Sequence, residues 1–224
     1  MKKKKTIIAA VILLLLFIVG GAIAYFTDKE TATNQFTIGN VDIEVIEPTW
    51  EALTDTDDDD IPDVAENMMP GETVDKDPRI HNLSDTNAAF VFMKVVAPCS
   101  TGETVNEQAT PVREVFNYTV NSGWYLMTPD NVCTNGTVTR IYAYGGASAM
   151  TLLPANDGSN TAHGDETPAL FNTVTLNPNL DGTERYTSNI QSIQITGYGV
   201  QTEGMFDEET TATPELLWRT ANFS

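Results

Sequence analysis

An almost wholly apolar run at residues 88–96 (AAFVFMKVV) constrains the fold more than any other feature of the sequence. A strand that is apolar at both parities has both faces covered, as a central strand of a sandwich does. Residues 41–45 (VDIEV) instead alternate apolar and acidic side chains, which is typical of a half-buried strand. The two patterns together predict a β-rich chain with one strand buried on both faces.

Further strand-like segments are separated by clusters of Gly, Pro, Asn and Asp. They lie at residues 116–120, 124–127, 137–144, 171–176 and 190–200. Phe36 and Ile38 have the opposite parity to the strand at 41–45, so a turn or bulge at Gly39-Asn40 is expected to reset the pleat. Short strands at this spacing are typical of sandwiches and jelly rolls.

Helix signals are few, and two loops are long. A turn or two is expected at residues 63–69, and Thr213-Pro214-Glu215 predicts the start of a short terminal helix. The long loops are expected at residues 98–110 and 153–168. Since the chain shows no repeat and no linker, residues 25–224 are predicted to form one mostly β, jelly-roll-like sandwich with a few short helices.

The first 24 residues have the three regions of a secretory signal. Residues 2–5 are all Lys, residues 7–19 are all apolar, and Ala22-Ile23-Ala24 provides a small-x-small cleavage site. We therefore expect cleavage between Ala24 and Tyr25. The alternative is an uncleaved anchor, since the apolar run is just long enough to span about 30 Å of hydrocarbon.

Cleavage would leave 200 residues (224 − 24) with a strong negative charge. The signal holds four of the twelve basic residues and no acid, so 8 basic and 31 acidic residues remain, a balance of −23. Nucleic acid is excluded as a partner because phosphate binding needs clustered Lys and Arg. The membrane is expected to be a partner only through the signal, and the protein is expected to be secreted, in the extracellular matrix or at the cell surface.

The chain has two cysteines, Cys99 and Cys133. In an oxidising compartment such a pair indicates one disulfide, and we favour it because both residues lie in polar, turn-rich segments. The alternative is two free thiols buried as small hydrophobes.

An acidic segment at residues 55–66 (DTDDDDIPDVAE) resembles a twelve-residue calcium loop. Oxygen ligands would come from positions 1, 3, 5, 7, 9 and 12, which are Asp55, Asp57, Asp59, the Ile61 carbonyl, Asp63 and Glu66. Asp60 stands where the pattern needs Gly at position 6. The segment predicts Ca²⁺ binding, against the alternative of a solvated acidic loop.

Catalytic motifs are missing from the sequence. The two histidines, His81 and His163, belong to no His-Glu-x-x-His arrangement, and there is no nucleophile elbow, phosphate loop or dinucleotide fingerprint. On these grounds the chain is predicted not to be an enzyme, with no catalytic residue and no organic cofactor.

Short motifs in order along the chain resemble the TasA/camelysin family, exported proteins of Gram-positive bacteria (Firmicutes). They include AYFTD at residues 24–28, NQFTIGNV at 34–41, MPGETV at 69–74, KDP at 76–78, AFVFMKV at 89–95, YTVNSGW at 118–124, YAYG at 142–145, LFN at 170–172 and GYGVQTEG at 197–204. Each motif is weak alone, but their order and spacing are specific.

The resemblance implies a jelly-roll-like fold, processing by a SipW-type signal peptidase, and assembly into biofilm matrix fibres by strand exchange. The partners expected are further copies of the chain, the peptidase and accessory matrix proteins. Residues 25–35 suit an N-terminal donor strand, because they lack Gly and Pro and offer Tyr25 and Phe26 as anchors. The alternatives are a camelysin-like surface metalloendopeptidase and a monomeric, calcium-dependent adhesion module.

Overall fold

The computed structural model describes residues 37–38, 41–57, 61–66, 68–85, 87–100, 104–105, 108–109, 113–128, 132–156, 164–180, 192–201, 213–221 and 223. The predicted signal and its cleavage residues Ala22, Ala24 and Tyr25 lie outside this part of the chain, as does the turn expected at Gly39-Asn40. In the described residues, no helix is both long and apolar enough to cross a membrane.

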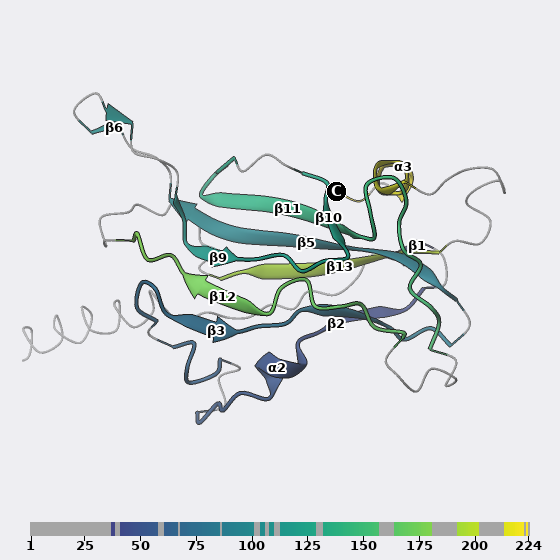
Figure 1. The fold of residues 1–224 in the computed structure, drawn as a ribbon, viewed down its shortest axis with the longest axis horizontal. Coiled ribbons are helices and arrows are strands. Elements are labelled where there is room, and N and C mark those ends of the chain that lie inside the picture. The colour runs from purple at the N-terminus through teal and green to yellow at the C-terminus, as the bar shows by residue number, and fades with distance from the viewer. Residues whose placement is uncertain are drawn as a thin grey trace, which may run out of the picture.

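The main sheet is built around the long strand β5 (Ala89–Ser100). Its strand order is β1-β13-β5-β11-β10 (Figure 1), where β1 is Thr37–Ile38, β13 is Gln194–Gln201, β11 is Thr137–Tyr144 and β10 is Trp124–Leu126. The short β8 (Arg113–Glu114) pairs with the end of β5. The β1–β13 pair is parallel, and every other pair in this sheet is antiparallel.

A second layer of shorter strands covers one face of this sheet. One pair consists of β2 (Ile43–Ile46) and β4 (Arg79–Asn82), and a three-stranded sheet consists of β3 (Thr73–Asp75), β12 (Thr173–Leu176) and β9 (Phe116–Tyr118). Backbone hydrogen bonds from Asn82 to Asp165 and from Thr167 to Ile80 join β4 to the segment that leads into β12, and so connect the two groups. They therefore form one layer, interrupted near Pro78, which has no N–H to donate.

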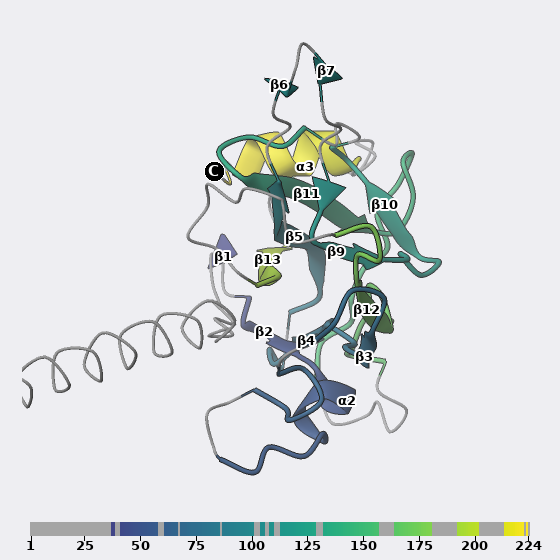
Figure 2. The same cartoon turned by 90° about the vertical axis from the view of Figure 1, so that its left-hand side faces the viewer.

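The remaining elements lie outside the two layers. The helix α2 (Pro48–Glu51) follows β2, and the helix α3 (Pro214–Ala221) packs on the outer face of the main sheet (Figure 2). A small hairpin of β6 (Thr104–Val105) and β7 (Gln108–Ala109) projects from the body.

Side chains on the two faces of β5 enter two separate clusters. Val91, Met93 and Val95 are buried against the second layer. Phe92 faces α3, where it belongs to a cluster with Tyr198 and Leu217. The prediction of a central strand buried on both faces is therefore confirmed.

Four aromatic rings fix α3 to the sheet. Trp218 meets Phe92 and Tyr198 edge-on, with ring centroids 5.2 Å apart in both pairs, and Phe223 lies 5.1 Å from Trp218. Such edge-to-face pairs stabilise beyond the apolar area that they bury. The short helix is thus anchored mainly by packing, as helices of this length must be.

The mostly β prediction is confirmed, and the two-layer arrangement is compatible with a jelly roll. The strand predicted at 137–144 matches β11, and the predicted terminal helix is α3. The loop expected at 98–110 is wrong in part, because β5 continues to Ser100 and β6 and β7 follow. Residues 63–66 form turns and no regular helix.

Candidate functional site

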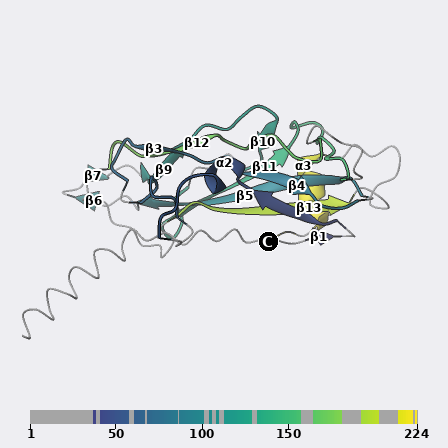
Figure 3. The ribbon, with the colours of Figure 1, turned by 90° about the horizontal axis from the view of Figure 1, so that it is seen from below.

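The edge of the main sheet at β13 is the first candidate site. Thr37 and Ile38 of β1 lie opposite Gly199 and Val200, whereas β5 pairs with the whole of β13. In the described part of the chain, residues 194–196 therefore have a strand partner on the β5 side only. Figure 3 shows the short β1 near one end of β13. An edge of this kind can accept a further strand.

Two glycines of β13 allow β2 and the residues before it to pack closely against the main sheet. A Cβ atom on Gly197 would lie 2.9 Å from Cγ2 of Val45, and one on Gly199 would lie 3.0 Å from Cγ1 of Val41. Tyr198, between them, faces α3 on the opposite side. The Gly-Tyr-Gly motif therefore places the second layer directly against the β13 edge.

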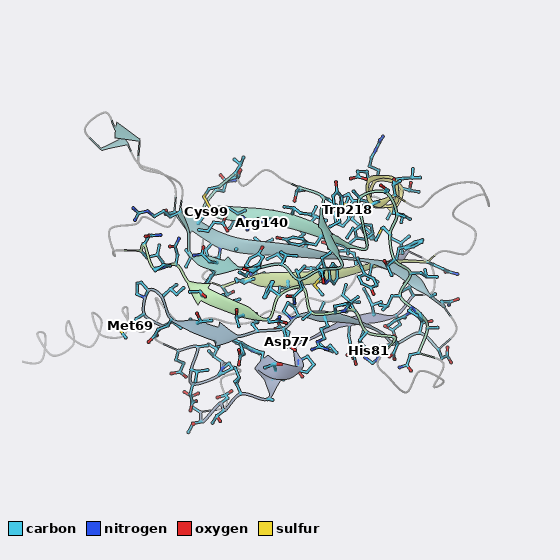
Figure 4. All side chains as sticks on the ribbon, viewed as in Figure 1. Met69, Asp77, His81, Cys99, Arg140 and Trp218 are labelled. Carbon is cyan, nitrogen blue, oxygen red and sulfur yellow. A yellow bond between two sulfur atoms is a disulfide. The ribbon has the colours of Figure 1, made fainter. Side chains whose placement is uncertain are left out.

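A histidine lies between two carboxylates in the second layer. His81 Nδ1 is 3.2 Å from Oε1 of Glu44, and His81 Nε2 is 3.1 Å from Oδ2 of Asp165. The amide nitrogen of Asn156 is 3.4 Å from the same Nε2. Figure 4 shows His81 on the β2–β4 side of the molecule. The ring thus joins β4 to β2 and to the segment that leads into β12.

Buried charges organise the chain around α2. Lys76 is buried and donates to Oε2 of Glu47 at 2.8 Å, with its ammonium group 4.0 Å from the centre of the Trp50 ring. Asp77 accepts the backbone N–H of Thr49 at 2.8 Å, near the first turn of α2. The Lys-Asp-Pro motif therefore has a structural role, since its acid side chain accepts one of the N–H groups that the first turn of a helix leaves without a partner inside the helix.

A second buried network joins β11 to β8 and β9. Both terminal guanidinium nitrogens of Arg140 donate to the Glu114 carboxylate, and one of them also donates to the Tyr118 hydroxyl at 3.3 Å. Burial opposes the charge of Arg140, but the hydrogen bond to Glu114 leads the effects that raise its pKa above the ordinary value. Burial also raises the pKa of Tyr142, whose hydroxyl lies 3.1 Å from that of Tyr118. Arg140 therefore keeps its positive charge, and hydrogen bonds link it to Glu114, Tyr118 and, through Tyr118, to Tyr142.

The two cysteines meet at the end of β5. The sulfur atoms of Cys99 and Cys133 are 1.98 Å apart in a disulfide, with their Cα atoms 6.1 Å apart. Cys99 lies opposite Glu114 in the β5–β8 pair, so the disulfide and the Arg140 network hold the same end of the sheet (Figure 4).

The acidic segment is ordered in part by its own side chains. Asp63 accepts the backbone N–H of Thr56 at 2.8 Å and the Thr56 hydroxyl at 2.6 Å. The hydroxyl bond is the largest cause that lowers the Asp63 pKa below its ordinary value. Ile61 is buried, and Asp57 is exposed. This geometry closes the loop between Thr56 and Asp63.

No group of three or more His, Cys, Asp or Glu side chains among the residues that the structure describes is placed to hold a metal ion. Asp59 lies outside the described residues, so five of the six predicted calcium ligands can be placed: Asp55, Asp57, Ile61, Asp63 and Glu66. Calcium binding stays a prediction.

Two features of these sites were missed from the sequence. Asp165 and Asn156 lie 84 and 75 positions from His81, and no motif links them. The close approach at Gly197 was also missed, although two glycines inside a strand indicate a close backbone approach.

The comparisons with known proteins point to one family. A family model described as camelysin metallo-endopeptidase matches residues 1–110. No curated protein and no solved structure matches the chain.

The family description corrects one prediction. The chain was predicted not to be an enzyme, and membership of a family described as a metallo-endopeptidase contradicts that prediction. A catalytic zinc takes about three protein ligands from His, Cys, Asp and Glu side chains. No three such side chains among the described residues are placed to hold a metal ion, so no catalytic ligand is assigned to them. The match agrees with the motifs found along the sequence, and the chain belongs to the TasA/camelysin family.

Proposed function

We propose that the protein is an extracellular subunit of biofilm matrix fibres that polymerises by N-terminal strand addition. The observation that carries the proposal is the β13 edge, where β1 covers only Gly199 and Val200 among the described residues. The resemblance of the sequence motifs to the TasA/camelysin family implies the same function, whereas the description of the family model names a peptidase. Cleavage by a SipW-type signal peptidase between Ala24 and Tyr25 would release the donor segment, and accessory matrix proteins are further candidate partners.

The register of β1 specifies where a donor segment would pair. Thr37 lies opposite Gly199, an offset of 162 (199 − 37), and Ile38 lies opposite Val200 with the same offset. In this parallel register, residues 32–34 of a neighbouring subunit would lie opposite Gln194, Ile195 and Thr196. Added backbone hydrogen bonds would then supply affinity at positions that have one strand partner among the described residues.

The composition of residues 25–35 suits this role. They lack Gly and Pro, include three β-branched threonines and begin with Tyr25 and Phe26. A segment that leaves one subunit and pairs with the next makes a head-to-tail contact that does not close, which generates a filament.

The charge of the chain affects how such a filament grows. Three of its few basic residues, Lys76, Arg79 and Arg140, already pair with acids inside the fold. Subunits with a balance of −23 repel one another, and salt screens this repulsion. Fibre growth is therefore expected to accelerate with ionic strength.

Electron microscopy of secreted protein tests the proposal. Deletion of residues 25–33 should leave a folded monomer that forms no fibres, whereas a scrambled 25–33 segment controls for length alone. Fibres like those of the wild type in the deletion variant would show that the donor lies elsewhere.

Peptide-bond hydrolysis is the second candidate function, and the family description favours it. A casein digest by the purified protein, with and without a chelator, tests it independently of fibre formation. Chelator-sensitive cleavage would support the peptidase, and undigested casein under both conditions would count against it.

A further inference from the structure

The environment of His81 has a chemical peculiarity. A neutral imidazole has one N–H donor and one acceptor nitrogen. If Nδ1–H donates to Glu44, the lone pair of Nε2 faces the Oδ2 atom of Asp165 at 3.1 Å. Two acceptors at this distance need a cation or a proton between them.

We propose that His81 Nε2, the Asp165 carboxylate and the Asn156 side-chain amide bind a divalent transition-metal ion such as Zn²⁺. The Asp165 carboxylate and the Asn156 amide both lie beside the Nε2 atom of the ring. Glu44 is on the other nitrogen, which is the carboxylate–histidine–metal arrangement that fixes the ring and raises its basicity. Two of the three ligands are a His and an acid side chain, and the third is an amide. The site therefore differs from a group of three His, Cys, Asp or Glu side chains, which the described residues do not form.

The distances suit shared coordination. Ligand atoms about 2.1 Å from one ion lie roughly 3.0 Å apart at right angles and roughly 3.4 Å apart at the tetrahedral angle. The separations from Nε2 are 3.1 Å to Asp165 and 3.4 Å to the Asn156 amide. The Asn156 oxygen and nitrogen can be exchanged by rotating the amide, so its oxygen can occupy the ligand position.

The ligand chemistry selects the class of metal. Imidazole nitrogen suits Zn²⁺ and its neighbours, whereas Ca²⁺ prefers oxygen ligands. The Asp165 side chain is 9% exposed and that of His81 is 20% exposed, so an ion would be partly shielded from water. It would connect β4 to the segments at residues 154–156 and 164–167.

This site would stabilise the second layer of the sandwich. The backbone N–H of Asn82 donates to the Asp165 carbonyl, and that of Asn156 donates to the Ser84 carbonyl. The three ligands thus lie on segments that already contact one another, and metal binding would add stability to the folded state by mass action. The inference does not depend on fibre formation or on peptidase activity.

Thermal unfolding and native mass spectrometry with Zn²⁺ test the proposal on full-length secreted protein. The wild type should bind one Zn²⁺ at this site, with a Tm several degrees higher in zinc than in chelator. His81→Gln and Asp165→Asn should remove that ion and the shift, and Glu44→Gln should weaken zinc affinity roughly 10- to 100-fold. Asp85→Asn, an equal charge change at an exposed residue, should leave both readouts unchanged.

Two outcomes would overturn the proposal. No zinc-dependent shift in the wild type would mean that a proton alone fills the gap beside His81. An undiminished shift in His81→Gln and Asp165→Asn would place the ion elsewhere in the chain. Circular dichroism without zinc checks that each variant is folded. Only a variant that keeps its fold is compared with the wild type.

Discussion

Thr37 and Gly199 are parallel partners at the edge of a sheet that is otherwise antiparallel. On its other side Gly199 pairs with Val91 of the central strand β5. The first described strand of the chain therefore contacts the sheet through β13 at two positions. Among the described residues, the rest of β13 pairs with β5 alone.

The glycines of β13 are predicted to be intolerant of side chains. Gly197→Val should destabilise the fold by about 1–3 kcal/mol, because even the first added carbon would lie 2.9 Å from Val45 Cγ2. Thermal or urea unfolding measures the change. Val45→Ala in the Gly197→Val background should restore part of the loss.

A second glycine provides the matched control. A Cβ atom on Gly146 would lie 3.7 Å from the Ala149 carbonyl oxygen, which is an ordinary contact. Gly146→Ala should therefore change stability little. Equal losses at Gly146 and Gly197 would contradict the packing argument.

The Cys99–Cys133 disulfide is predicted to contribute strongly to stability. It closes a loop of 35 residues counting both ends (133 − 99 + 1), for which the chain-entropy estimate is about 3–4 kcal/mol. The Cys99→Ala, Cys133→Ala double variant should lose about this much in chemical unfolding. Non-reducing mass spectrometry that finds two alkylatable thiols in native secreted protein would refute the bridge.

Calcium is predicted to stabilise the acidic segment at residues 55–66. The Tm should be higher in calcium than in chelator, since a cation that binds the folded state shifts the unfolding equilibrium. Asp57→Asn combined with Glu66→Gln should abolish the difference. The same shift in wild type and double variant would mean that calcium binds elsewhere.

Asp63 is predicted to titrate below the ordinary range because of Thr56. A carboxyl whose folded pKa is lowered stabilises the fold above its unfolded pKa, and this contribution is lost as pH falls through the folded pKa. Thr56→Val removes the hydroxyl donor at 2.6 Å and keeps the backbone donor. The Asp63 pKa should then rise toward its ordinary value in an NMR titration, and an unchanged pKa would assign the shift to another group.

Local patterns were enough to predict the long strands. Residues 137–144 match β11, and the apolar run around Phe92 is buried on both faces because α3 and the second layer cover it. The β3 and β4 strands were missed because each contains a single apolar residue, Val74 or Ile80, and so shows no alternation of its own. Pro78 lies between them and interrupts the pattern that a single strand would show.

The candidate sites depended on contacts that no local pattern encodes. His81 meets Asp165 across 84 positions, and Arg140 meets Glu114 across 26. The sequence shows each of these residues as polar, but only the pairing of β4 and β8 with their neighbours brings the partners together. The cysteines were easier to pair, because the chain has two.

Intersubunit cross-linking during assembly tests strand addition most directly. The register places residue 34 of a donor opposite Thr196 (196 − 162), so Asn34→Cys protein and Thr196→Cys protein are mixed and oxidised. The account predicts a cross-linked pair that contains one copy of each variant and appears as fibres grow. Two results together would contradict the account. The mixture would give no cross-link, and the Asn34→Cys, Thr196→Cys double variant would form its disulfide within one monomeric chain.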